Sequence, residues 1–173
     1  MSASVRPPAP GDEATAKRSD QPGLHALVQA FQAGLSRQLW GVVLFGSAAR
    51  GEARDASDLD LLVVADGLPD RFGQRIGLLR DLVPASLRGK VSFIARTRAE
   101  FETEFPAYYL DIGLDGIILF DRDGYLGARL ARIRELIRAA GLSRHRGDQG
   151  FSWRWVQPPT GHWRIDWSGV TGL

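Results

Sequence analysis

The chain has 173 residues, of which 44% are hydrophobic and 24% are charged, a composition typical of one globular domain with a core of its own. It contains no cysteine, so a disulfide scaffold, a thiolate metal site and a cysteine nucleophile are excluded. The net charge of +2 is unevenly spread, because residues 1–123 hold 14 basic and 17 acidic residues whereas residues 124–173 hold 8 basic and 3 acidic ones.

The first 21 residues contain three prolines and scattered charges but no apolar stretch. They lack the apolar core of a signal peptide, and we expect a disordered leader over residues 1–21. No apolar run in the chain is long enough for a membrane span, so we expect no membrane partner. The lack of cysteine fits a cytoplasmic protein, which is the location we expect.

Helical and strand patterns alternate along residues 22–141. The i, i+3, i+4 spacing of apolar residues predicts helices over 22–35, 69–83, 108–114 and 126–137. Short apolar runs predict buried strands over 39–45, 59–65, 91–95 and 117–120, and the capping-box spacing of Thr97 and Glu100 predicts the start of another helix. This order indicates an α/β (α+β) domain with one central sheet flanked by helices, in which Tyr108 and Tyr109 belong to the core.

Residues 142–173 form a Trp- and Arg-rich C-terminal extension. The period-two alternation of Trp153 with Trp155, and of Trp163 with Trp167, predicts a short hairpin across Pro158 and Pro159. Two interpretations stay open. A basic aromatic surface for nucleic acid would use Arg132, Arg134, Arg138, Arg144 and Arg146. We favour a solvated helix face, with tryptophans that cover the sheet or a second copy in a homo-oligomer.

The segment from Phe45 to Val64 carries the features that indicate chemistry. Gly46 and Ser47 end the first predicted strand, where a glycine allows a ligand to approach the backbone and the serine can cap a helix whose free N–H groups favour phosphate. Arg50 lies one turn further and can reach the same phosphate. A lone Gly-Ser turn is usually only a turn, so this half of the pattern is weak by itself.

Asp58 and Asp60 stand two residues apart at the start of the second predicted strand, so their side chains share a face. Two neighbouring carboxylates repel each other unless a divalent cation offsets their charge, and oxygen ligands suit Mg²⁺ or Mn²⁺. An isolated Asp-x-Asp is usually a pair of solvated carboxylates. A phosphate loop beside paired carboxylates, however, is the combination that phosphoryl or nucleotidyl transfer requires.

The segment Gly46-Ser47-Ala48-Ala49-Arg50-Gly51 with Ser57-Asp58-Leu59-Asp60 resembles the GSxxRG…SDxD signature of the polymerase-β-like nucleotidyltransferases, and in particular their small single-domain "minimal" members. The resemblance implies a mixed sheet flanked by helices over residues 22–141. It implies that Gly46, Ser47 and Arg50 bind the phosphates of ATP or another nucleoside triphosphate. It also implies that Asp58 and Asp60 are the catalytic, metal-binding residues.

One position departs from the family pattern. Active members of the family usually supply a third carboxylate from the next core strand, where this sequence has Ser92. Four acids lie further along the chain, and spacing selects none of them: Glu100, Glu102, Asp111 and Asp115. Because the third carboxylate is missing, an alternative function stays open: the protein would be a catalytically weak or inactive module that binds nucleotides or another protein.

We therefore expect a nucleotidyltransferase that moves a nucleoside monophosphate from a triphosphate to a hydroxyl, with Mg²⁺ as cofactor. The resemblance implies a protein acceptor, a helical HEPN-type partner for which this chain would be the antitoxin. A small molecule or an RNA end stays open as the acceptor.

Overall fold

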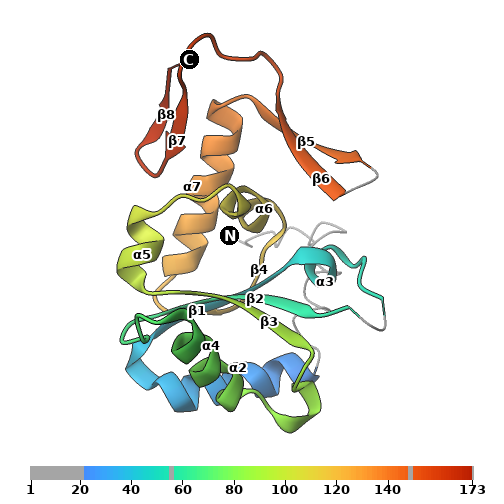
Figure 1. The fold of residues 1–173 in the computed structure, drawn as a ribbon, viewed down its shortest axis with the longest axis vertical. Coiled ribbons are helices and arrows are strands. Elements are labelled where there is room, and N and C mark those ends of the chain that lie inside the picture. The colour runs from blue at the N-terminus through green and yellow to red at the C-terminus, as the bar shows by residue number, and fades with distance from the viewer. Residues whose placement is uncertain (1–21, 55–56, 148–149, 173) are drawn as a thin grey trace, which may run out of the picture.

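The protein is described by a computed structural model that covers residues 22–54, 57–147 and 150–172. The predicted leader at residues 1–21 lies outside the described residues. A central sheet separates two helical layers, with α2 and α4 on one side and α5, α6 and α7 on the other (Figure 1). This architecture confirms the predicted fold class.

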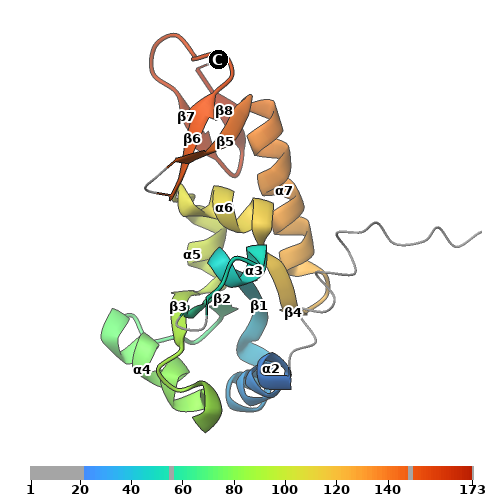
Figure 2. The same ribbon diagram turned by 90° about the vertical axis from the view of Figure 1, so that its right-hand side faces the viewer.

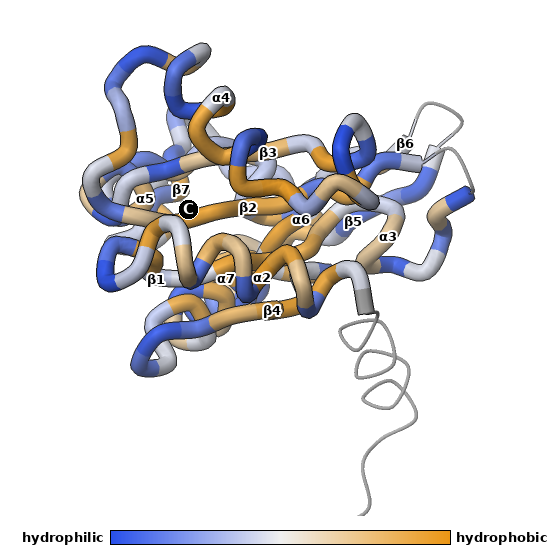
Figure 3. Tube along the Cα trace, turned by 90° about the horizontal axis from the view of Figure 1, so that it is seen from below, coloured by the Kyte–Doolittle hydropathy of each residue, from blue (hydrophilic) through white to orange (hydrophobic). Residues whose placement is uncertain are grey.

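Four strands form the sheet in the order β3-β2-β1-β4. Their bounds are β1 Leu39–Phe45, β2 Leu59–Ala65, β3 Val91–Arg96 and β4 Ile117–Asp121. The β1 strand pairs antiparallel with β2 and β4, whereas β2 and β3 are parallel, so the sheet is mixed. Side chains of β1 and β2 are buried on both faces, which explains their continuous apolar runs. Figure 3 shows this hydrophobic colouring along β2.

The first helical layer consists of α2 Pro22–Leu35 and α4 Phe72–Leu82, with short 3-10 turns at Ser36–Gln38 and Ala85–Leu87. Leu27 and Phe31 of α2 and Leu79 of α4 are fully buried against this face of the sheet. Helix α4 ends just before Pro84, as the sequence predicts, because the residue before a proline avoids the helical conformation.

The second layer consists of α5 Arg98–Thr103, α6 Tyr108–Asp115 and α7 Tyr125–Ala139. The predicted capping box is confirmed: Glu100 N donates to Thr97 Oγ1, and Thr97 N donates to a Glu100 carboxylate oxygen. Tyr109 is fully buried, so its predicted place in the core is confirmed. No helix of the part of the chain that the structure describes is long and apolar enough to span a membrane.

The C-terminal extension forms two hairpins where the sequence analysis predicts one. Strands β5 Leu142–Gly147 and β6 Gly150–Trp155 pair with each other, and β7 Arg164–Asp166 pairs with β8 Gly169–Thr171. The predicted pairing across Pro158 and Pro159 is therefore wrong, because β6, which holds Trp153 and Trp155, pairs with β5, and β7, which lies between Trp163 and Trp167, pairs with β8. Both hairpins lie beside the C-terminal half of α7, far from α2 and α4 (Figure 2).

The extension packs on the second helical layer. Trp153 and Trp167 contact the core cluster of that layer, and Trp167 Nε1 donates to the carbonyl of Glu104 at 2.8 Å. Several arginines of the basic segment bond within the chain, as Arg132 does to the carbonyl of Ser168 at 3.1 Å and Arg134 to that of Gly113 at 2.9 Å. These contacts favour the interpretation in which the tryptophans cover the protein's own core, although they cover its helices rather than its sheet.

Candidate active site

The turn after β1 lies in close contact with Asp60. Phe45, the last residue of β1, stands opposite Asp60 in the antiparallel ladder. Gly46 follows with φ +71°, and a Cβ atom added to it would lie 2.2 Å from Asp60 Oδ2. Both the left-handed backbone and the close approach require glycine here. The turn and the carboxylate therefore form one compact site.

Ser47 does not cap a helix, contrary to the sequence prediction. Helix α3 is Gly46–Arg50, so it begins one residue earlier, and no side-chain oxygen caps it. Ser47 lies within its first turn, where backbone N–H groups have no partner inside the helix. The Gly-Ser turn thus offers N–H groups beside Asp60.

Asp60 is the second residue of β2, and Asp58 directly precedes that strand. Ser92 stands opposite Asp60 in the parallel ladder with β3, and its hydroxyl donates to Asp58 Oδ2 at 3.3 Å. Asp58 is exposed, whereas Asp60 is partly buried. Burial raises the pKa of the Asp60 carboxyl above its ordinary value, and repulsion from Asp58 raises it further.

The two carboxylates fit a divalent cation. Within residues 22–54, 57–147 and 150–172, neither Asp58 nor Asp60 forms an ion pair with a basic side chain. The same part of the chain holds no group of three His, Cys, Asp or Glu side chains that could hold a metal. Mg²⁺ commonly takes one or two carboxylates and fills its other positions with water and substrate phosphates. The donor set therefore suits Mg²⁺ together with a bound triphosphate.

The four acids considered as a third carboxylate are engaged elsewhere. Glu100 forms an ion pair with the buried Arg75 at 2.7 Å, and Glu102 pairs with Arg98 at 2.9 Å. Asp111 and Asp115 both pair with Arg144. Each acid is thus held in a structural contact, and the position opposite Asp60 belongs to Ser92.

The raised pKa of Asp60 predicts a measurable effect on stability. The folded protein binds this proton more tightly than the unfolded chain does, so ionisation weakens the fold as the pH rises from the ordinary value of 3.8 through the raised pKa. In EDTA, Asp60→Asn is expected to raise Tm at roughly pH 7, and the gain should vanish near pH 4. Differential scanning fluorimetry across this range measures it. An equal or lower Tm at neutral pH would show that Asp60 carries no electrostatic cost.

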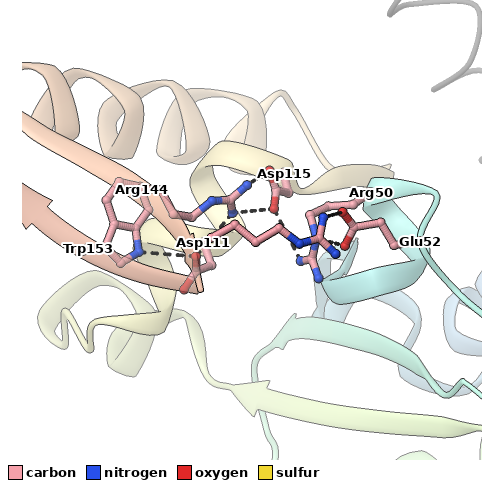
Figure 4. A network of polar contacts seen from close by, with 7 residues as sticks. Arg50, Glu52, Asp111, Asp115, Arg144 and Trp153 are labelled. Atoms are coloured by element: carbon pink, nitrogen blue, oxygen red, sulfur yellow. Dashed lines mark hydrogen bonds and ion pairs between the residues drawn. The ribbon is translucent and has the colours of Figure 1, made fainter. Parts of the chain in front are cut away.

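Arg50 points from α3 into a network of carboxylates (Figure 4). Its Nε donates to Glu52 at 2.9 Å and its Nη1 to Asp115 at 3.5 Å. Its guanidinium carbon also lies 4.8 Å from the centre of the Phe151 ring, a cation–π contact. Arg50 therefore joins the Gly-Ser turn to α6 and to the C-terminal extension.

The β5–β6 hairpin completes this network. Arg144 donates two bonds to Asp115, at 2.5 and 2.9 Å, and Arg146 donates to Glu52 at 2.6 Å. Trp153 Nε1 donates to Asp111 at 3.3 Å. The sequence analysis considered Asp111 and Asp115 as a third carboxylate, but it gave Arg144, Arg146 and Trp153 no place beside the Gly-Ser turn. The only signal was the run of arginines at the start of the extension, which did not identify their carboxylate partners.

The ion pair between Arg144 and Asp115 is expected to hold the hairpin in place. Both side chains are nearly buried, with 12% and 13% of their surfaces exposed. Asp115→Asn is expected to cost about 2 kcal/mol, or roughly 4–8 °C in Tm, because it leaves a charged guanidinium poorly paired. Asp111→Asn, in which the replaced acid is 40% exposed, should cost less. Thermal unfolding of both variants measures the two losses in Tm. A larger loss for Asp111→Asn than for Asp115→Asn would contradict this prediction.

A cleft of about 420 Å³ opens beside Asp58 at the β3 edge of the sheet. Asp58 and Ser92 line it on one side, and Arg80 and Arg88 line it on another. The Gly-Ser turn lies on the opposite side of β2, because it follows β1. The carboxylates therefore stand between a turn with free N–H groups and a cleft with basic side chains.

Comparison with known proteins identifies the family. A family model for the nucleotidyltransferase domain matches residues 34–122, the segment that contains Gly46, Asp58 and Asp60. The chain belongs to the nucleotidyltransferase family. This nucleotidyltransferase is 34% identical over 112 residues to MJ1305 of Methanocaldococcus jannaschii, which is named as a candidate protein adenylyltransferase. The alignment covers 58% of this chain and 71% of that relative.

Two solved structures share the fold. A toxin–antitoxin complex with AMP-PNP contains a chain that matches with a TM-score of 0.50 and 17% identity, over 66% of this chain and 86% of that one. A variant of the MntA–HpeT toxin–antitoxin complex matches with a TM-score of 0.50 and 17% identity, over 68% and 88%. The family match and this fold confirm the predicted superfamily and the predicted enzyme class, a nucleotidyltransferase.

Proposed function

We propose that this nucleotidyltransferase moves a nucleoside monophosphate, AMP when ATP is the donor, to a hydroxyl group of a partner protein. The observation that carries the proposal is the pair Asp58 and Asp60, which form no ion pair with a described basic residue and of which Asp60 adjoins the Gly46 turn. The relative MJ1305 is named for protein adenylylation. Two solved neighbours are chains of toxin–antitoxin complexes. The partner in this proposal is a helical HEPN-type protein, with this chain as the antitoxin.

Each residue has a defined role in this proposal. The N–H groups at Gly46 and Ser47 bind the phosphates, and Arg50 contributes positive charge from the same helix. Asp58 and Asp60 hold Mg²⁺ or Mn²⁺, which when bound supplies Lewis-acid stabilisation of charge on the phosphates. The absence of a basic partner leaves the carboxylate oxygens available for that role.

Transfer with ATP labelled on different phosphates tests the proposed reaction. The full chain, Mg²⁺ and the protein encoded by the neighbouring gene are incubated with ATP labelled on either the α- or the γ-phosphate. Label from the α-phosphate is expected on the partner, whereas label from the γ-phosphate should leave as pyrophosphate. Transfer of the γ label would indicate a kinase reaction and would contradict the proposal.

The alternative function is a module that binds nucleotide without transferring it. Ser92 in place of an acid, and the engagement of the other four acids in ion pairs, favour this alternative. Isothermal titration with ATP and Mg²⁺ separates the two functions when it is combined with the transfer assay. Binding without transfer to any hydroxyl acceptor would establish the alternative.

A further inference from the structure

The β3 strand is an open edge of the sheet beside Asp58. In the described residues β3 pairs with β2 alone. The carbonyl of Lys90 accepts a bond from Leu59 N on β2, whereas the carbonyl of Ala95 accepts from Arg75 outside the sheet. Because backbone groups alternate sides along a strand, those of Val91 and Phe93 point away from β2.

The backbone groups of Val91 and Phe93 have no hydrogen-bond partner within the described ranges. Both residues line the cleft that contains Asp58. Unpaired N–H and C=O groups on an edge strand are a template for another extended segment, which binds by adding a strand to the sheet. The cleft therefore offers backbone pairing next to a catalytic carboxylate.

The charges around the cleft select an acidic ligand. Arg80 and Arg88 line it, and the exposed Lys90 follows in the same loop. None of these three forms an ion pair with a described residue. This contrasts with Arg75, Arg98, Arg129 and Arg144, which all pair with carboxylates. Free basic side chains beside an open edge strand complement a peptide rich in Asp or Glu.

The order of the strands indicates that the acceptor hydroxyl enters through the cleft. In nucleotidyl transfer the attacking and leaving oxygens lie roughly in line on opposite sides of the α-phosphorus. Phosphates bound at the Gly46 turn would place the leaving pyrophosphate on the β1 side of Asp58 and Asp60. The attacking hydroxyl then arrives from the β3 side, where the cleft lies.

We propose that the acceptor is an extended acidic segment of the partner protein, which adds to β3 as a strand and presents a Ser, Thr or Tyr hydroxyl at Asp58. Its carboxylates pair with Arg80 and Arg88. The hydroxyl oxygen bonds to the α-phosphorus, the bond from that phosphorus to the bridging oxygen breaks, and pyrophosphate leaves with the electron pair. The hydroxyl proton passes to solvent. This inference rests on the proposed function and specifies its acceptor.

Synthetic peptides with one hydroxyl residue test the inference with the full chain, Mg²⁺ and α-phosphate-labelled ATP. One peptide has Glu on both sides of the hydroxyl, a second has Lys, and a third repeats the Glu peptide with N-methylated backbone at alternate positions. We expect kcat/KM for the Glu peptide to exceed that for the Lys peptide by about tenfold or more. The N-methylated peptide should lose most of the activity, because it cannot pair with β3.

Charge reversal at the cleft provides the matched variant. Arg80→Glu combined with Arg88→Glu is expected to invert the preference toward the Lys peptide and to leave the affinity for ATP unchanged. Arg71→Glu, at the opposite end of α4, should behave as the wild type. Equal labelling of the Glu and Lys peptides overturns the inference. Labelling of an RNA 3′-hydroxyl that is lost in the Arg80→Glu, Arg88→Glu variant also overturns it. Failure to label any acceptor, the partner protein included, contradicts the proposed function itself.

Discussion

Asp60→Asn is expected to lower the rate of nucleotidyl transfer by at least about a thousand-fold, since a metal ion contributes several kcal/mol to stabilising phosphate charge. The substitution keeps the shape of the side chain but removes the negative charge that holds a divalent cation. Transfer of label from α-phosphate-labelled ATP to the partner protein, followed over time, gives the rate. The same variant should be at least as stable as the wild type in EDTA, so unfolding cannot explain the loss.

Asp70→Asn is the matched control for this experiment. Asp70 is exposed and lies beyond the opposite end of β2 from Asp60, so its replacement changes the net charge equally without touching the site. Its transfer rate should equal that of the wild type. Unchanged transfer by Asp60→Asn would show that the carboxylate pair does not hold the metal that catalysis uses.

Gly46→Ala is expected to have the second-largest effect. The added Cβ would lie 2.2 Å from Asp60 Oδ2, so either the turn or the carboxylate must move by about an ångström. Displacements of that size at a catalytic site cost roughly a hundredfold in rate. We expect kcat/KM for ATP to fall by about this factor, measured by the same label transfer at limiting ATP.

Gly124→Ala separates the contact with Asp60 from strain in the backbone. Gly124 has the same φ of +71°, but a Cβ atom added there meets nothing within 4 Å. Both variants should lose about 1–2 kcal/mol of stability from the left-handed conformation. Only Gly46→Ala should lose transfer activity. Equal losses of activity in the two variants would mean that strain, and not the approach to Asp60, limits the reaction.

The sequence predicted the core of this fold closely because its elements follow local rules. The buried strands at 39–45 and 59–65 are continuous apolar runs, and the Thr97–Glu100 box satisfies helix N–H groups by a fixed spacing. Such signals need only neighbouring residues. The Gly-Ser and Asp-x-Asp motifs belong to this class, and the structure brings Gly46 and Asp60 into contact.

The parts that the sequence could not predict depend on residues far apart in the chain. Arg146 and Glu52 are 94 positions apart, and no periodicity signals such a pair between side chains near the surface. Strand pairing in the extension is likewise set by which segments meet after packing, so the alternation of tryptophans predicted strands but not their partners. Helix α3 begins at Gly46, one residue before Ser47, and no side chain caps it, which the Gly-Ser pattern alone does not show.

The central claim is that Asp58 and Asp60 bind a divalent cation beside phosphates held by the Gly46 turn. A crystal structure with Mn²⁺ and a non-hydrolysable ATP analogue tests it directly, because the anomalous signal locates the metal. We expect a Mn²⁺ peak in contact with both carboxylates and phosphate oxygens within hydrogen-bond distance of the turn. Bound nucleotide with Mn²⁺ elsewhere, or with no metal at Asp58 and Asp60 at saturating Mn²⁺, would contradict the claim.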